Sequence, residues 1–377
     1  MDGSIIGQPE RVGMDRGGLE QAVEHLEKLR RDGMHDGAQL FIARHGIPVL
    51  DVALGEARPG IPLKTDSVML WFSSTKPLTA VAIAQQVERG KLELDDPVKK
   101  YIPDFGNGKE TCTVRHVLKH MGGFRMVNFP FLRYDWETNI RKICEEPAEW
   151  EPGTAAGYHP LSGWNILGEI VRRVDGRPIE VYLRGEIFQP LGMEGSSLGI
   201  TAEREKQLGD RLSQVTEKTM PKPPPNPWND RRARPRILPG GNGYGPAHDL
   251  AKFYLMLWNG GEWDGYRFLK KETVALFTAT HRKDVIDRTF SLQAGMDVMP
   301  PWALGFHKGF DQPMNIGFGR RATAAAYGHG GARSSIGFVE PTRDLVVTCV
   351  TNGMPTELEN TRRLRDVSDF IHGAVIG

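Results

Sequence analysis

Ser73 and Lys76 form the one S-x-x-K sequence of this chain, in the segment Ser73-Ser74-Thr75-Lys76. The apolar residues 68–72 precede it, and residues 77–84 follow with a helical pattern. Residues i and i+3 lie one helical turn apart, so the lysine amine is expected beside the serine hydroxyl. A serine is a poor nucleophile until a neighbouring base takes its proton, and a Ser-Lys pair is one arrangement that does so. The spacing therefore predicts a catalytic serine at the start of a helix.

Two further segments carry residues that suit a reaction at this serine. Residues 151–158 form a loop that ends at Tyr158, just before a helix expected to begin near Ser162. A tyrosine in that place can project into a cleft. Residues 327–332 (Tyr-Gly-His-Gly-Gly-Ala) open a strand near the C-terminus. The glycines of that strand let a substrate approach the backbone closely.

Composition argues against several classes of function. The chain has 377 residues, of which 39% are hydrophobic and 25% are charged, as in an ordinary soluble globular protein. Its net charge of +1 gives no electrostatic reason to expect binding to nucleic acid or to an anionic membrane. The three cysteines are scattered and predict neither a disulfide framework nor a zinc site. No dinucleotide or phosphate-loop motif is present, so no cofactor is expected.

The N-terminal sequence bears on location. Residues 1–4 lack the basic and apolar regions of a signal peptide, and no apolar run approaches the roughly 18 residues that span a membrane. We therefore expect a cytoplasmic protein whose partner is a small molecule. The sequence leaves the oligomeric state open.

The hydrophobic patterns predict strands at both ends of the chain and helices between them. The expected helices cover residues 14–31, 76–89, 113–120, 162–174, 248–259 and 357–374. Two hairpins are expected, from residues 38–44 with 48–54 and from 335–340 with 345–351, and residues 220–245 read as a long irregular loop.

Hairpins make antiparallel pairs, so the expected sheet is antiparallel. The predicted fold is α+β, an antiparallel sheet built from both chain termini and flanked by helices, with a largely helical region inserted. Residues 1–72 and 240–377 would form the sheet domain and residues 73–239 the helical domain, with the active site between them.

The order of the motifs resembles that of the serine β-lactamase and penicillin-binding-protein superfamily, above all its class C branch and the family VIII carboxylesterases. Three pieces carry the resemblance: Ser73-x-x-Lys76, the Pro152-Gly153-Thr154 segment leading to Tyr158, and His329-Gly330-Gly331 in place of the family's Lys-Thr-Gly. The resemblance implies a β-lactamase/transpeptidase-like fold. It also implies that Ser73 becomes acylated and that Lys76 and Tyr158 share the proton transfers, with the base left open.

The resemblance assigns the remaining roles as well. The backbone N–H groups of Ser73 and Ala332 would form the oxyanion hole, and the strand of His329, Gly330 and Gly331 would bind substrate. A positive charge on Lys76 is expected to lower the pKa of Tyr158. His116 and His120 stand at a spacing that can bind zinc, but no adjacent glutamate completes a protease motif, so no metal is expected.

Two departures from the family pattern bear on the substrate. The lactamase branch reads Tyr-x-Asn where this chain has Tyr158-His159-Pro160, and proline offers neither the amide side chain nor a backbone N–H. His329 replaces a charged lysine that attracts the substrate carboxylate, and a histidine is mostly neutral at pH 7. Both changes weaken the recognition of β-lactams and D-Ala-D-Ala peptides without affecting acyl transfer at Ser73.

The sequence therefore predicts a serine carboxylesterase that cleaves small to medium acyl esters. Tyr244 and Trp302 are expected in substrate binding, as part of an apolar acyl pocket. The alternatives are a β-lactamase, a D-amino-acid amidase or peptidase, and an acyltransferase on the same site. A non-catalytic ligand-binding protein is a further alternative, and the presence of Ser73, Lys76 and Tyr158 together argues against it.

Overall fold

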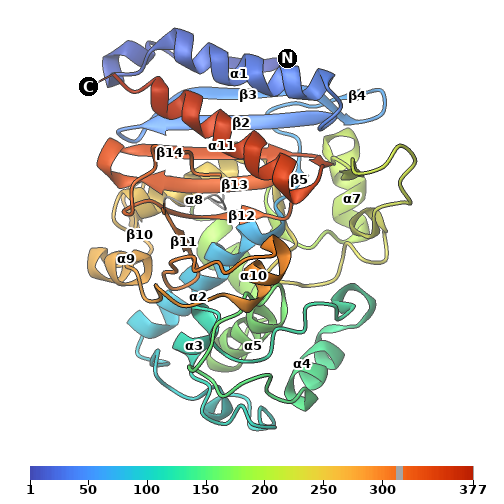
Figure 1. Ribbon diagram of the computed structural model, residues 1–377, viewed down its shortest axis with the longest axis vertical. Helices are drawn as coiled ribbons and strands as arrows, with labels where there is room; N and C mark the ends of the chain where they lie inside the picture. Colours follow the sequence, from blue (N-terminus) through green and yellow to red (C-terminus); the bar gives the residue numbers. More distant parts are fainter. Residues whose placement is uncertain (311–316, 377) are drawn as a thin grey trace.

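The computed structural model describes residues 1–310 and 317–376. Its main sheet has the strand order β1-β3-β2-β14-β13-β12-β11, with β4 paired to β3, and its neighbouring strands are antiparallel (Figure 1). The strands are β1 (Asp2–Ile5), β2 (Gly37–Arg44), β3 (Ile47–Arg58), β4 (Ile61–Pro62), β11 (His307–Lys308), β12 (Tyr327–Gly331), β13 (Ser335–Glu340) and β14 (Leu345–Thr351). The predicted antiparallel sheet from both chain ends is thus confirmed.

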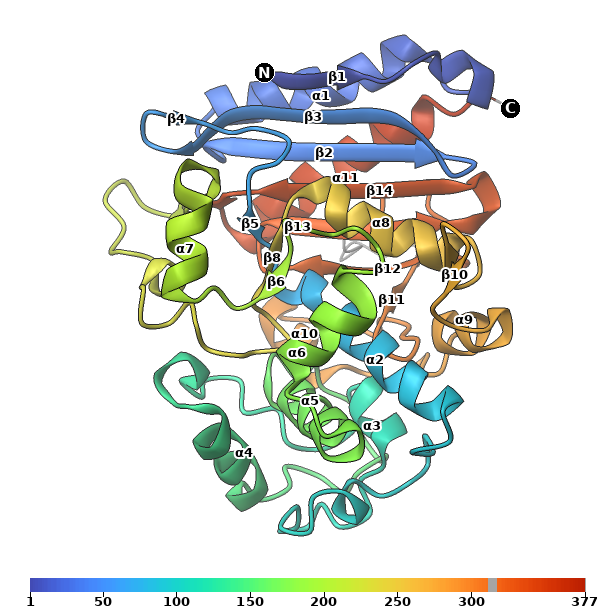
Figure 2. The same cartoon turned by 180° about the vertical axis from the view of Figure 1, so that it is seen from behind.

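Helices lie on both faces of this sheet and in a separate helical region. The helices of the described residues are α1 (Arg16–Arg31), α2 (Lys76–Glu88), α3 (Val114–Leu118), α4 (Trp136–Glu145), α5 (Ser162–Asp175), α6 (Ile179–Leu183), α7 (Ala202–Leu208), α8 (Ala247–Trp258), α9 (Lys271–Thr278), α10 (Arg288–Ala294) and α11 (Glu357–Gly373). Helices α1 and α11 lie together on one face, and α8 lies on the other (Figures 1 and 2). Among the described residues, no helix is both long and apolar enough to cross a membrane.

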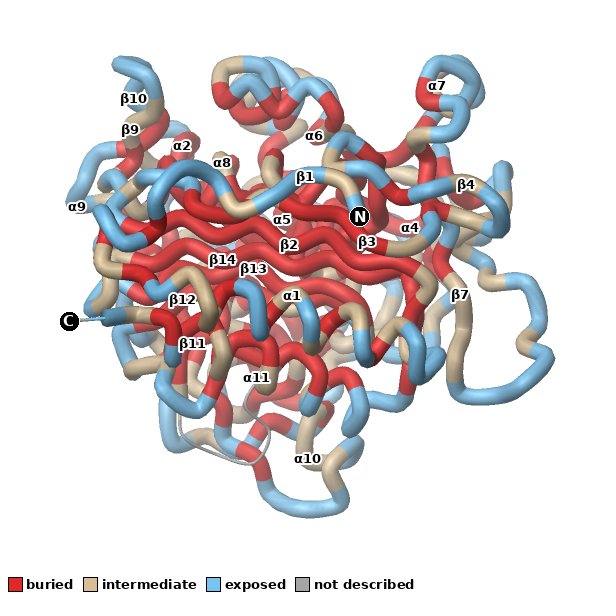
Figure 3. Tube along the Cα trace, turned by 90° about the horizontal axis from the view of Figure 1, so that it is seen from above, coloured by how far each residue is buried: buried red, intermediate tan, exposed pale blue. Residues whose placement is uncertain are grey.

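The sheet is buried on both faces because its strands alternate between two cores. Every residue of β2 is buried, and Figure 3 shows the central strands as a buried layer between the helices. Leu40 and Ile42 belong to the cluster shared with α1 and α11, whereas Phe41 and Ala43 belong to the cluster shared with α8. Successive side chains of a strand point to opposite faces, so one strand serves both cores.

Short strand pairs lie outside the main sheet. Strand β8 (Gly243–Gly245) pairs with β5 (Met69–Leu70) and with β6 (Ser197–Leu198). Strand β7 (Thr216–Glu217) pairs with β15 (Gly353–Met354), and β9 (Glu262–Trp263) pairs with β10 (Tyr266–Arg267). The pairing of β5 with β8 matters most here, because β5 leads directly into the segment of Ser73.

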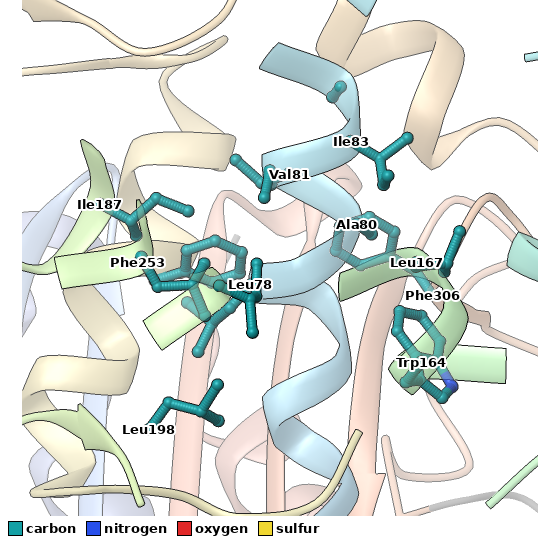
Figure 4. Packing of buried hydrophobic residues seen from close by; sticks show 14 of the residues in the cluster. Leu78, Ala80, Val81, Ile83, Trp164, Leu167, Ile187, Leu198, Phe253 and Phe306 are labelled. Atoms are coloured by element: carbon teal, nitrogen blue, oxygen red, sulfur yellow. The ribbon is translucent and has the colours of Figure 1, made fainter. Parts of the chain in front are cut away.

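Helix α2 begins at Lys76 and runs through the middle of the protein, buried along nearly its whole length. Figure 4 shows its side chains Leu78, Val81 and Ile83 enclosed by residues of other elements, among them Phe253 and Phe306. A fully buried aliphatic side chain contributes about 1.5–3 kcal/mol relative to an exposed one. The helix that begins three residues after the candidate serine is therefore held by its packing on all sides.

The helical region between the sheet segments also contains long loops. Helix α3 is shorter than the predicted 113–120, and residues 119–135 and 146–161 are largely irregular. Within the predicted loop 220–245, the structure adds a 3₁₀ turn at Pro227–Asn229 and the strand β8. These two irregular segments meet at His120 and Tyr158, beside the candidate site.

Candidate active site

Ser73 and Lys76 meet as their spacing predicts. Ser73 is half-buried in a 3₁₀ turn (Phe72–Thr75) that runs directly into α2, and Lys76 is the first residue of that helix. The Nζ atom of Lys76 lies 2.7 Å from Ser73 Oγ and 2.6 Å from the carbonyl oxygen of Gly240. Phe72, just before the serine, has a φ of 49°, in the left-handed region that a bulky residue rarely adopts. A sharp, strained turn thus presents the serine at the helix start.

The strand of His329 is fastened to this turn. Ser74 Oγ donates to the carbonyl of His329 at 3.0 Å, and Ser335 Oγ donates to the carbonyl of Trp71 at 2.6 Å. A Cβ atom added at Gly331 would lie 2.1 Å from the Trp71 carbonyl oxygen, so no other residue fits there without a shift of the backbone. The chain turns at Ala332 immediately after this contact. The predicted oxyanion donors at Ser73 and Ala332 therefore belong to two segments that are held against each other, and their convergence on one oxygen stays a prediction.

Tyr158 completes the group of predicted catalytic residues. Its ring centre is 5.0 Å from Lys76 Nζ, and the Ser73 side chain is near enough to affect the pKa of the tyrosine. The ring of Phe290 lies 5.1 Å away and that of Trp302 5.8 Å away, centre to centre. The structure thus brings Ser73, Lys76 and Tyr158 together from two segments of the chain.

The backbone around Tyr158 is held from two sides. The Tyr158 N–H donates to Asp287 Oδ1 at 3.0 Å, and Thr289 Oγ1 donates to the Tyr158 carbonyl at 3.1 Å. On the other side, Gly157 N–H donates to the carbonyl of His120 at 3.0 Å, and His159 N–H donates to His120 Nδ1 at 3.0 Å. An irregular loop with this many bonds to its backbone holds its side chain in a defined place.

Burial sets the protonation of the two candidate bases. Lys76 is fully enclosed, and the loss of hydration lowers its pKa well below the usual 10.5. Burial raises the pKa of Tyr158, against a smaller opposing effect of the neighbouring Ser73 side chain. The sequence-based expectation that a charged Lys76 lowers the pKa of Tyr158 is therefore wrong: desolvation dominates for both groups, and it favours a neutral amine beside a neutral phenol.

Three buried histidines stand around the tyrosine. Burial lowers the pKa of His120, His307 and His329 well below 6.5. His329 Nδ1 lies 2.6 Å from the carbonyl oxygen of Gly330, which can only accept, so Nδ1 carries the proton. This leaves His329 Nε2 as an acceptor, and it has no partner among the described residues. The position where the family has a lysine thus holds a neutral ring.

The other predicted substrate-binding residues lie in different surroundings. Trp302 is fully buried behind Tyr158 and 5.7 Å from His329, and Gly330 is half-buried on β12. Pro160 is half-buried two residues after Tyr158, and its role stays a prediction. Tyr244 lies in a separate buried cluster with Leu70 and Phe72, so its predicted contact with substrate is not supported.

The histidines singled out for a possible metal site have other roles. His116 Nδ1 accepts from the Thr113 N–H at the start of α3, and His120 faces Tyr158 at 4.7 Å between ring centres. Within residues 1–310 and 317–376, no three His, Cys, Asp or Glu residues are placed to hold a metal ion.

A second serine motif and one supporting residue, Asp287, were not identified from the sequence. Residues 195–199 read Gly-Ser-Ser-Leu-Gly, the G-x-S-x-G pattern of another hydrolase class, but Ser197 lies on β6 and its Oγ donates to the Gly199 carbonyl. Asp287 carries a local signal, since an aspartate before a helical pattern is a typical N-cap. Nothing local indicates that it reaches Tyr158.

Comparisons with known proteins agree with this geometry. A family model described as Beta-lactamase matches residues 20–369. The chain is 31% identical to the "Esterase/beta-lactamase LipL" of Mycobacterium tuberculosis, over 86% of this chain and 79% of that protein. It is 29% identical to "Esterase EstB" of Burkholderia gladioli, over 52% of this chain and 56% of that protein.

Among solved structures, a family VIII carboxylesterase is similar with a TM-score of 0.79 at 25% identity, covering 94% of this chain and 98% of that chain. A penicillin-binding-protein homologue from Caulobacter crescentus has a TM-score of 0.78 at 26% identity, covering 96% and 99%.

Proposed function

Because this chain belongs to the β-lactamase family of hydrolases, we propose that it is a serine carboxylesterase that cleaves small to medium acyl esters through an acyl-enzyme on Ser73. One observation carries the proposal: a fully buried lysine amine lies 2.7 Å from a half-exposed serine hydroxyl. A lysine with a strongly lowered pKa is a competent base for such a hydroxyl.

The proposed reaction follows from these contacts. Neutral Lys76 takes the proton of Ser73 as Oγ attacks the ester carbonyl. The backbone N–H groups of Ser73 and Ala332 stabilise the oxyanion, and the removal of one such donor typically costs about 2.7–4 kcal/mol of transition-state stabilisation. Tyr158, kept protonated by its raised pKa, passes a proton to the departing alkoxide and is reprotonated from Lys76. Water then attacks the acyl-serine and releases the acid, so one ester and one water give one acid and one alcohol.

The neutral histidine at position 329 favours an ester substrate that carries no carboxylate group. A lysine in the third motif would offer a positive charge to an anionic substrate, whereas His329 is buried and neutral. Pro160 offers no amide side chain to hold an acylamino group. Since LipL is described as both esterase and β-lactamase, β-lactam turnover is the alternative to be tested.

A direct comparison of two substrates tests this specificity. The wild type should turn over p-nitrophenyl butyrate well and nitrocefin slowly or not at all. The double variant Pro160→Asn/His329→Lys should raise the ratio of lactam to ester turnover about tenfold, because each restored hydrogen bond contributes roughly 1–3 kcal/mol. The measurement is kcat/KM for both substrates with each enzyme.

Single variants show whether an unexpected result in the double variant comes from a loosened Tyr158 loop or from an error in the specificity argument. Pro160 has a fixed φ, so Pro160→Asn can loosen the Tyr158 loop and lower both activities together. The exposed His45→Lys variant is the control for an added lysine and should leave the ratio unchanged. An unchanged ratio in the double variant, or a wild type equally fast on nitrocefin and on esters, contradicts the specificity argument.

The pH dependence of kcat/KM should reflect the two shifted pKa values. Lys76 must be neutral to act as base, so activity is lost as pH falls through its lowered pKa. As pH rises, kcat/KM should reach its full value well below pH 10.5. Tyr158 must stay protonated, and its raised pKa predicts no decline up to about pH 10. Initial rates with an ester of pH-independent leaving-group absorbance measure the profile. A rise centred near 10.5 would mean that Lys76 titrates as an ordinary lysine.

A further inference from the structure

Asp287 and Arg282 form a buried ion pair next to the candidate active site. Both side chains are almost fully buried, and Arg282 donates to Asp287 Oδ2 at 2.9 Å. The other carboxylate oxygen, Oδ1, accepts N–H bonds from Thr289 at 3.0 Å, from Phe290 at 3.2 Å and from Tyr158 at 3.0 Å. A single carboxylate therefore caps α10 and holds the backbone of the candidate catalytic tyrosine.

Capping alone does not explain the arginine. Asp15 and Asp135 cap α1 and α4, which are longer helices, and in the described residues each accepts a backbone N–H without forming an ion pair with an arginine. Arg282, by contrast, lies against Trp302 with its guanidinium 5.4 Å from the ring centre and donates to the Lys119 carbonyl at 3.0 Å. Burial lowers its pKa to about 10, so it stays charged at neutral pH. Burying two charges carries a large desolvation cost, which is offset only by good geometry and by further hydrogen bonds such as those made here.

Three bonds tie the same segment to the Tyr158 loop. Besides the bond from Tyr158 N–H to Asp287, the Arg288 N–H donates to the Ala156 carbonyl at 2.9 Å. Thr289 Oγ1 donates to the Tyr158 carbonyl. Phe290, next in the chain, lies against the tyrosine ring at 5.1 Å. Residues 287–290 thus contact both the backbone and the ring of Tyr158, at the face away from the His120 bonds.

We propose that the Asp287–Arg282 pair is a positioning device for Tyr158, which fixes its phenol relative to Lys76 and Ser73 by anchoring its backbone N–H. The inference rests on the proposed function, because it concerns the proton transfers assigned to Tyr158. Asp287 touches no reacting atom in this scheme and acts only through the tyrosine. A misplacement of a catalytic group by about 1 Å can cost on the order of a hundredfold in rate.

A double-mutant cycle with Tyr158→Phe tests the proposal. Asp287→Ala is combined with Arg282→Met so that no buried charge is left unpaired. In the otherwise wild-type enzyme, this pair of substitutions should lower kcat for p-nitrophenyl butyrate by about a hundredfold, with little change in KM. In the Tyr158→Phe background it should lower kcat by less than about threefold, because the group that it positions is gone. Equal losses in both backgrounds would overturn the proposal.

A matched control separates positioning from general stability. Glu205 pairs with the buried Arg234 at 2.9 Å in a different part of the protein. Glu205→Ala with Arg234→Met should lower Tm, as Asp287→Ala with Arg282→Met is expected to do. It should leave kcat within about twofold of the parent enzyme, both with Tyr158 and with Tyr158→Phe. If the control lowers kcat as much as the Asp287 pair at equal loss of Tm, the effect is structural and the proposal fails.

A milder variant keeps the test decisive if the double replacement does not fold. Thr289→Val removes the donor to the Tyr158 carbonyl and leaves the ion pair in place. It should lower kcat severalfold with Tyr158 present and have no effect in the Tyr158→Phe background. An equal or larger loss of kcat in the Tyr158→Phe background would contradict the proposal that these contacts position the tyrosine. Failure here is distinct from failure of the proposed function, because Ser73→Ala tests the latter independently of Tyr158.

Discussion

Replacement of Ser73 by alanine should abolish ester hydrolysis, with a loss in kcat of about a thousandfold or more, and leave the fold intact. Removal of a nucleophile leaves only the catalysis due to binding and oxyanion stabilisation. The hydroxyl lies on a turn held by α2 and β12 rather than holding them, so Tm should hardly change. Initial rates with p-nitrophenyl butyrate and a thermal melt give both quantities.

A covalent label and a second serine complete this test. A fluorophosphonate should modify the wild type at Ser73, as located by peptide mass spectrometry, and should not modify the alanine variant. Ser197→Ala is the matched control, because Ser197 belongs to the one other motif that suggests a nucleophile, and its activity should stay at the wild-type level. Residual activity above about one per cent in Ser73→Ala means that another group is the nucleophile.

The second large effect is expected from the two proton-transfer residues. Lys76→Ala and Tyr158→Phe should each lower kcat by roughly 10²–10⁴-fold, because general acid-base groups contribute on that order. The double variant should be scarcely slower than the slower single variant, since residues that act as one unit are strongly non-additive. Their proximity supports this, with Lys76 Nζ 5.0 Å from the centre of the tyrosine ring and 2.7 Å from Ser73 Oγ.

Lys109 provides the control for the removal of a buried lysine. It is fully buried, its pKa is lowered by burial, and its Nζ donates to the Cys144 carbonyl at 3.3 Å, in the helical region near α4. Lys109→Ala should reduce Tm without a comparable fall in kcat. If the loss in kcat of the Lys76/Tyr158 double variant equals the product of the two single losses, the two residues act independently and the prediction is wrong.

The sequence predicted those features that depend on short distances along the chain. The Ser73–Lys76 contact follows from one helical turn, and the hairpin of β13 and β14 has the predicted bounds because its apolar runs flank a clear turn at residues 341–344. Tyr158 required the resemblance to a known family, since its own surroundings in sequence are those of an ordinary loop.

The remaining features depend on contacts between distant segments. Asp287 lies 129 residues after Tyr158, and no pattern around either residue indicates that they meet. Tyr244 was assigned to the substrate from its place near a motif, but the strand pairing of β8 turns its ring into a core cluster. The pKa of Tyr158 was misjudged for the same reason. The effect of a charged neighbour can be inferred from a motif, whereas burial is a property of the whole fold.

The sheet also has a consequence for synthesis of the chain. Strand β2 pairs with β14, and the partners Arg44 and Leu345 are about 300 residues apart in sequence. At a translation rate of roughly 5–20 residues per second, β2 and β3 wait on the order of 15–60 s for the strand that completes the middle of the sheet. During that time an apolar hairpin has one unpaired edge, which is the kind of edge that recruits other chains. Chaperone demand and yield on expression should therefore depend on the ribosome's pace between the codons of β2 and those of β14, as well as on the stability of the finished protein.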